Sequence, residues 1–139
     1  MRKFSVVTLH HSPITMNEKT SVTDACEQMR ARRAGSVLVT GDAGRLVGIF
    51  TGRDAVCRVV AQRRDPSSTC LGEVMTRNPK TMLPDQTAYE VLRMMAEGGF
   101  RHLPLVKNGG IVGLASRGDF RGLDLNPDDE ECDLWEHLH

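Results

Sequence analysis

Two short stretches of the chain carry a hydroxyl and a carboxylate at the same spacing, each directly after an apolar run. The first reads GIFTGRD and places Thr51 three positions before Asp54; the second reads GLASRGD and places Ser116 three positions before Asp119. A hydroxyl at a helix N-terminus with a carboxylate three residues on is a capping pair, and the same helix end can hold an anion. Each stretch is therefore either a plain helix cap or a cradle for a phosphorylated ligand. Its repetition in matched settings favours the cradle.

The overall composition argues against several classes of function. The chain has 139 residues, and its 18 Lys and Arg residues balance its 18 Asp and Glu residues. Proteins that mainly grip nucleic acid or an anionic membrane carry a basic excess, which this chain lacks. No apolar run approaches the roughly 20 residues needed to span a bilayer, and the first residues show no cleavable leader. We therefore expect a cytoplasmic protein without nucleic-acid or membrane partners.

The sequence contains no arrangement typical of an enzyme or a metal site. It has no P-loop, zinc motif or nucleophile elbow, and its four cysteines form no C-x-x-C pair. A hydrolase that uses Asp54, Asp119 and His102 is a weak alternative, because carboxylates at helix caps do not form a nucleophile, a base and an orienting group. We expect no catalytic residues, no metal ion and reduced cysteines.

The chain contains an internal repeat, and this repeat sets its architecture. Residues 13–16 align with residues 79–82 at an offset of 66, and Met29 then aligns with Met95. One residue is lost near Gly44, after which the offset is 65. A single one-residue gap over so long a match is difficult to obtain by chance. The chain is thus expected to consist of two copies of one unit.

Both copies show the same order of expected elements. A short extended piece precedes a helix that begins after Ser21 or Thr87, each followed three residues later by an acid, as in a capping box. Apolar residues then recur at helical spacing, and two strands about a Gly-containing turn follow. The expected helical stripes are Val22, Ala25, Cys26 and Met29, and Ala88, Val91, Leu92 and Met95. The expected strands are 14–16, 36–40 and 46–50, and 80–82, 103–107 and 111–115, with a second helix at 54–62 in the first copy.

A polar linker and an acidic tail divide the chain into parts. The linker, residues 63–68, precedes one or two expected helical turns at residues 71–75. From residue 124 the chain is acidic, and Trp135 lies on the apolar side of a short expected helix that must dock on its own chain or on a second copy. The expected parts are a lead-in with the first repeat at 1–66, the second repeat at 67–123 and the tail at 124–139.

Together these features resemble a family. The chain resembles a pair of cystathionine-β-synthase (CBS) domains over about residues 8–123. The resemblance is carried by the repeated unit, the sequence VMTRNP ahead of the second copy, FRHLPL in its middle strand and the two stretches described first. The resemblance implies an α/β (α+β) fold in which two β-α-β-β-α repeats, a Bateman module, pack sheet to sheet about a pseudo-two-fold axis and leave two clefts. It also implies a non-catalytic regulatory sensor of adenosine-containing ligands such as AMP, ADP, ATP, NAD or S-adenosylmethionine. Stand-alone modules of this family are usually homodimers.

The resemblance also assigns residues to the two clefts. In the first, Thr51 and Asp54 would hold phosphate and ribose, because a carboxylate can accept from both ribose hydroxyls and the helix end faces phosphate. The other residues of the first cleft would be Arg53, Lys80, Thr81, Arg101, His102, Leu103 and Pro104. The second cleft would contain Ile14, Thr15, Gly35, Ser36, Val37, Ser116, Arg117 and Asp119.

The two clefts differ in charge. Arg101 and His102 give the first cleft a fixed cation and a switchable donor, whereas Gly35 and Ser36 give the second neither. We therefore expect tighter binding of a phosphorylated ligand in the first cleft. The alternative function is a ligand-free dimeric scaffold that uses the fold and the acidic tail for contacts. In either case a regulated protein partner is expected that the sequence does not identify.

Overall fold

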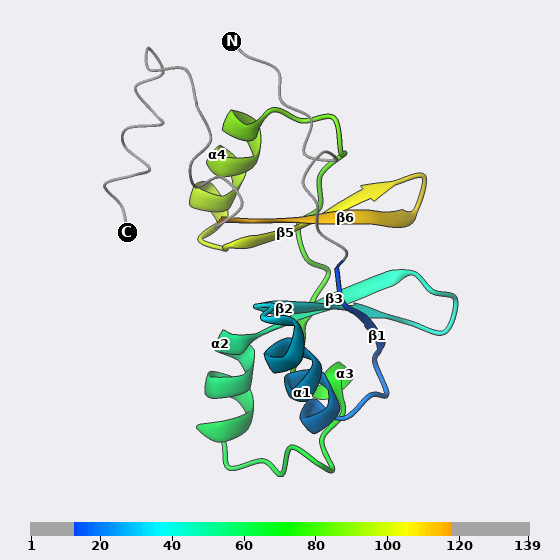
Figure 1. Cartoon of the computed structure of the whole chain (residues 1–139), viewed down its shortest axis with the longest axis vertical. Helices are drawn as coiled ribbons and strands as arrows, with labels where there is room; N and C mark the ends of the chain where they lie inside the picture. The colour runs from blue at the N-terminus through cyan, green and yellow to red at the C-terminus, as the bar shows by residue number, and fades with distance from the viewer. Residues whose placement is uncertain (1–12, 118–139) are drawn as a thin grey trace. The chain divides into compact units, whose positions relative to one another are not determined.

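The computed structural model describes residues 13–117. These residues form two compact units, one built mainly from residues 13–80 and one mainly from residues 81–117 (Figure 1). The expected N-terminal lead-in, Asp119 and the acidic tail with Trp135 lie outside the described residues.

The first unit is built on a four-stranded sheet with the order β1-β2-β3-β4. The strands are β1 (Thr15–Asn17), β2 (Ser36–Thr40), β3 (Leu46–Thr51) and β4 (Thr76–Arg77). β1 runs parallel to β2, and the β2–β3 and β3–β4 pairs are antiparallel. The register sets Ser36 opposite Thr51 and Gly48 opposite Arg77. The sequence predicts the first three strands, and the structure confirms them; β4 is an additional strand.

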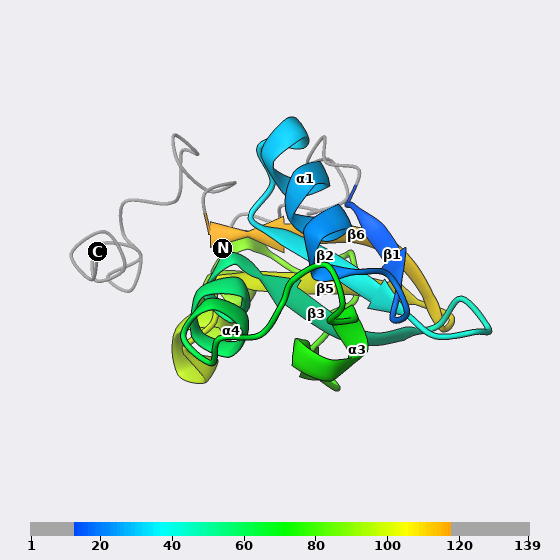
Figure 2. The ribbon, with the colours of Figure 1, turned by 90° about the horizontal axis from the view of Figure 1, so that it is seen from below.

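The helices of the first unit lie on one side of this sheet (Figure 1; Figure 2). α1 (Val22–Arg32) begins where the Ser21 hydroxyl accepts a hydrogen bond from the Asp24 amide, and it ends at Arg33 in a left-handed conformation with φ 51°. A short α3 (Leu71–Val74) follows the linker, as predicted. The predicted stripe of α1 is confirmed for Val22, Ala25 and Met29, which are buried, while Cys26 is partly buried against the core.

The second helix of the first unit has an unexpected geometry. It begins as α2 (Gly52–Asp54) and continues as the π-helical segment η2 (Ala55–Val60). π-Helical turns are wider than α-helical turns, which changes the face that each residue presents. Val59 is buried, but Val56 and Val60 are 61% and 71% exposed. The prediction of a helix over this segment is confirmed, although its α-helical part ends at Asp54.

The core of the first unit fills the space between the sheet and its helices. Its residues come from β2, β3, α1, η2 and α3, which are far apart in sequence. They are Ile14, Val22, Ala25, Met29, Val37, Val39, Phe50, Val59, Leu71, Val74 and Met75. Because Phe50 and Val59 flank the residues 51–54, this core fixes the place where β3 ends and α2 begins.

The second unit repeats the same local structures. α4 (Ala88–Gly98) begins with a complete capping box between Thr87 and Glu90, and its predicted stripe is buried. The strands β5 (His102–Lys107) and β6 (Gly110–Ser116) form a hairpin, with Asn108 and Gly109 at φ 54° and 78° in its turn. Positive φ at both positions is what an Asn-Gly hairpin turn requires. The prediction of a strand at 80–82 is wrong, because only an isolated parallel bridge forms there, between Met82 and Leu105.

Gly48 allows the segment from α3 to β4 to approach β3. A Cβ atom at this position would collide with the Met75 side chain and lie 2.9 Å from the Thr76 carbonyl oxygen. We therefore expect Gly48→Ala to lower the free energy of unfolding by about 1–3 kcal/mol, because backbone must shift to admit the methyl group. Urea denaturation measures this change.

Gly52→Ala is the matched control, since a Cβ at Gly52 meets nothing within 4 Å. It should leave stability unchanged or raise it slightly. Equal denaturation midpoints for the two variants would show that the Met75 side chain and the Thr76 carbonyl oxygen do not limit the space at Gly48.

Candidate functional site

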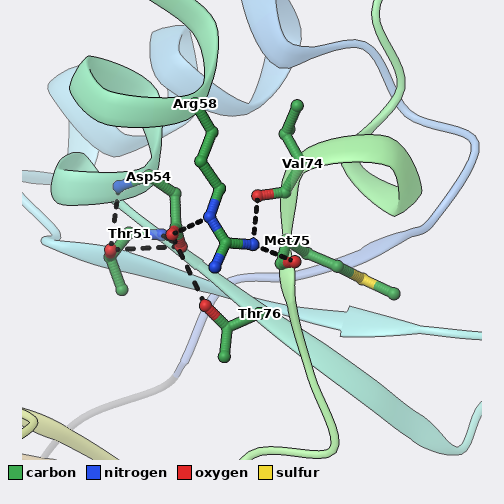
Figure 3. Close-up of polar contacts among 6 residues, drawn as sticks. All are labelled: Thr51, Asp54, Arg58, Val74, Met75 and Thr76. Atoms are coloured by element: carbon green, nitrogen blue, oxygen red, sulfur yellow. Dashed lines mark hydrogen bonds and ion pairs between the residues drawn. The ribbon is translucent and has the colours of Figure 1, made fainter.

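The first of the two stretches forms a helix cap. Thr51 ends β3, and its hydroxyl accepts a hydrogen bond from the Asp54 amide at 3.3 Å. The Asp54 carboxylate in turn accepts from the Thr51 amide at 3.0 Å through Oδ2 (Figure 3). These reciprocal bonds are the capping box that the spacing predicts. The cap interpretation is therefore confirmed, and the Asp54 carboxylate lies at the N-terminal end of α2.

Asp54 is buried, with only 7% of its surface exposed. Its Oδ2 also accepts from the Thr51 hydroxyl at 3.2 Å. Its Oδ1 accepts from the Thr76 hydroxyl at 3.4 Å and lies 3.5 Å from Nε of Arg58. A buried carboxylate is costly unless it is paired and hydrogen-bonded. The side chains around Asp54 provide that pairing.

Arg58 connects this carboxylate to the chain ahead of β4. Its Nη1 donates to the carbonyl oxygens of Met75 at 2.8 Å and Val74 at 3.4 Å, as Figure 3 shows. Its side chain is 46% exposed, so one side faces solvent while the guanidinium edge faces Asp54. The segment Val74–Thr76 is thereby joined to the start of α2.

The sequence-based site lacks both Arg58 and Thr76. Arg58 follows Asp54 by four residues on an expected helix, and such pairs are neighbours on a helix surface. This spacing therefore predicts the contact between Asp54 and Arg58. Thr76 reaches Asp54 only because β4 pairs with β3, and a two-residue strand has no periodicity to detect. Arg53, which the prediction includes, is exposed and lies inside α2.

Two of the predicted second-cleft residues of the first unit, Gly35 and Ser36, lie near the same helix end. The Gly35 carbonyl accepts from the Gly52 amide at 3.2 Å, and Ser36 faces Thr51 across the β2–β3 pair. Among the described residues, the Ser36 hydroxyl is the buried side-chain group without a hydrogen-bond partner. Ile14 and Val37 are core residues, and Thr15 is exposed on β1.

The predicted residues of the second unit gather at the ends of β5 and β6. The Arg117 amide donates to the Arg101 carbonyl at 2.8 Å. This bond joins the backbone just before β5 to the backbone just after β6. Leu103 and Pro104 are buried, His102 and Ser116 are partly exposed, and Arg101 is exposed. Lys80 and Thr81 are exposed at the boundary between the units. That residues of both repeats bind one ligand stays a prediction.

Two ionisable groups of the first unit have shifted pKa values. The hydrogen bond from the Cys70 amide, at 2.7 Å, lowers the pKa of Glu73, and the guanidinium of Arg64 at 3.2 Å lowers it further. This carboxylate caps α3 and so helps to hold the segment that leads to Thr76. Burial raises the pKa of the Cys26 thiol, as expected for a cysteine that serves as a small apolar residue.

The described residues hold neither a metal-binding cluster nor a membrane-spanning helix. Within residues 13–117, no three His, Cys, Asp or Glu side chains gather in a way that could hold a metal ion. None of the helices in that range combines the length and apolar character that crossing a membrane demands.

Comparison with known proteins places the chain in a family. The model of the CBS domain matches this chain twice, at residues 5–60 and 71–125. The CBS domain-containing protein CBSCBSPB2 of Arabidopsis thaliana is 46% identical over 101 residues, which are 73% of this chain and 19% of that protein. The chain thus spans about a fifth of the length of this relative.

Solved structures agree with the family match. A CBS-domain-containing protein from Agrobacterium tumefaciens is 30% identical with a TM-score of 0.76, and the match covers 84% of this chain and 95% of that one. A CBS domain protein from Pyrobaculum aerophilum, solved in complex with AMP, is 24% identical with a TM-score of 0.78, over 87% and 93% of the two chains. The matches confirm the α/β fold of a CBS pair, and this chain belongs to the CBS domain family as a tandem pair.

Proposed function

We propose that this chain is a non-catalytic sensor that binds an adenosine-containing ligand, with Thr51 and Asp54 holding its phosphate and ribose. The observation that carries the proposal is a buried carboxylate, that of Asp54, at the N-terminal end of a helix that directly follows a sheet strand. Membership of the CBS family supports it, as does the AMP bound by the Pyrobaculum aerophilum protein.

The chemistry of this helix end suits a ribose phosphate. A carboxylate accepts hydrogen bonds only, and the neighbouring hydroxyls of a ribose donate two. The N-terminus of a helix favours an anion through its free N–H groups and its dipole. The exposed guanidinium of Arg53, next to Asp54, adds a positive charge that a phosphate can approach. One ligand that carries both groups can therefore use both features.

The buried Ser36 hydroxyl, at the start of β2, favours the binding of a polar ligand beside Thr51. A buried hydroxyl without a partner costs free energy, and Ser36 lies opposite Thr51 in the sheet. A ligand group that hydrogen-bonds to it would remove this cost. In the second repeat we propose Ser116 and Arg117 as ligand contacts, and Arg101 and His102 as further phosphate contacts.

Calorimetric titration of nucleotide-stripped protein with AMP, ATP, NAD and S-adenosylmethionine tests the proposal. We expect saturable heat with at least one of the four, and the order of affinities would identify the class of signal. An absence of heat with all four, on protein that circular dichroism shows to be folded, would contradict it. That result would favour the alternative of a dimeric scaffold, for which the exposed Val56 and Val60 of η2 offer an apolar surface.

A further inference from the structure

Four polar contacts occupy the two oxygens of Asp54, and they are not equivalent. Thr51 makes both contacts to Oδ2, at 3.0 and 3.2 Å, and these hold the helix cap. Thr76 and Arg58 make the contacts to Oδ1, at 3.4 and 3.5 Å. A carboxylate offers about four acceptor positions, so a ligand hydroxyl must replace an existing contact. The longer contacts identify Oδ1 as the oxygen that a ligand can reach at the lower cost.

The two groups at Oδ1 differ in how firmly they are held. The Thr76 hydroxyl belongs to an exposed residue and turns about a single bond, so it can give way to a ligand. The Arg58 guanidinium is fixed from its other side, because Nη1 donates to the Met75 carbonyl at 2.8 Å. Its planar fork holds Nε and Nη1 in a fixed relation. Figure 3 shows the guanidinium between the carboxylate and these carbonyls.

We infer that Arg58 is a positioning residue for ribose recognition. Anchored on the Val74 and Met75 carbonyls, it fixes Oδ1 of Asp54 in the orientation that receives a ligand hydroxyl, while the Thr76 hydroxyl is the group displaced. This inference rests on the proposed function. Arg58 acts through Asp54, and its contribution is therefore to the preference for ribose over deoxyribose and not to phosphate binding.

The test compares AMP with 2′-deoxy-AMP, which lacks one hydroxyl donor. We expect the wild-type chain to prefer AMP by about tenfold, the usual effect of one hydrogen bond to a charged group. Arg58→Gln should reduce this preference to about twofold or less. Arg64→Gln is the matched control, because Arg64 is also a half-exposed arginine of this repeat but pairs with Glu73, at 3.2 Å. It should keep the full preference.

The ratio of the two affinities separates positioning from folding. If Arg58→Gln only destabilises the fold, the affinities for AMP and 2′-deoxy-AMP fall together and their ratio keeps the wild-type value. That result would overturn the role of Arg58 and leave the proposed function intact. A wild-type chain that binds AMP no better than the deoxy ligand would overturn it too. If the wild type binds neither of these ligands, nor ATP, NAD or S-adenosylmethionine, the proposed function itself fails. Should Arg58→Gln not fold, Arg58→Lys gives the same readout, because an ammonium group cannot hold the carboxylate and the carbonyls in one planar fork.

Discussion

Replacing Asp54 with alanine is expected to lower the affinity for AMP by about ten- to a hundredfold. On the proposed function the substitution removes the Oδ1 acceptor of a ribose hydroxyl, and one hydrogen bond to a charged group contributes about 1.5–3 kcal/mol. It also removes one half of the α2 capping box, so the free energy of unfolding should fall by about 0.5–2 kcal/mol. Calorimetric titration measures the first effect and urea denaturation the second.

Asp24→Ala is the control for this variant. Asp24 occupies the same third position of a capped helix, α1, and it is exposed. Its removal should cost less helix stability, because the Ser21 cap uses the Asp24 amide and not its carboxylate, and it should leave AMP binding unchanged. Wild-type affinity in the Asp54 variant would show that the ligand is held elsewhere on the chain.

Phe50→Ala is expected to have the largest effect on stability. Phe50 lies on β3 with 0% of its surface exposed and belongs to the core of the first unit. Truncating a buried phenylalanine to alanine costs about 3–5 kcal/mol, through lost burial and the cavity left behind. Domains are stable by only about 5–15 kcal/mol, so the variant should unfold at a much lower urea concentration. Because Phe50 directly precedes Thr51, AMP binding should weaken as well.

Phe100→Ala is the comparison for Phe50. Phe100 is partly buried against the core of the second unit, so the lost burial and the cavity are both smaller. A denaturation midpoint that falls equally in the two variants would contradict the role given to the first core.

The elements with strong local signals are those that the sequence predicts correctly. β2 has the predicted bounds, Ser36–Thr40, because it is a continuous apolar run that ends at a Gly-containing turn. α1 and α4 begin at the predicted caps, Ser21 and Thr87, because their hydroxyls bond to amides three residues along the chain. Local propensity and burial agree in these segments, which is why pattern alone identifies them.

The features that the sequence misses depend on contacts between distant segments. β4 has two residues and forms because α3 delivers Thr76 and Arg77 to the edge of β3. The π-helical geometry of η2 leaves no mark in the apolar spacing, so the exposure of Val56 and Val60 is not predictable from the sequence. For the site, the pair Thr51 and Asp54 is local and predictable. The contact between Asp54 and Thr76 spans 22 positions and is not.

The strand β4 has a consequence for how the two repeats can be separated. The residues that complete the first sheet, Thr76 and Arg77, come after the linker that divides the two copies in sequence. A fragment that ends at residue 66 would expose the edge of β3 and leave Arg58 without its carbonyl acceptors. Such a fragment should pair its open edge with other chains and aggregate. The first repeat can be transplanted into another protein only if the graft extends to about residue 80.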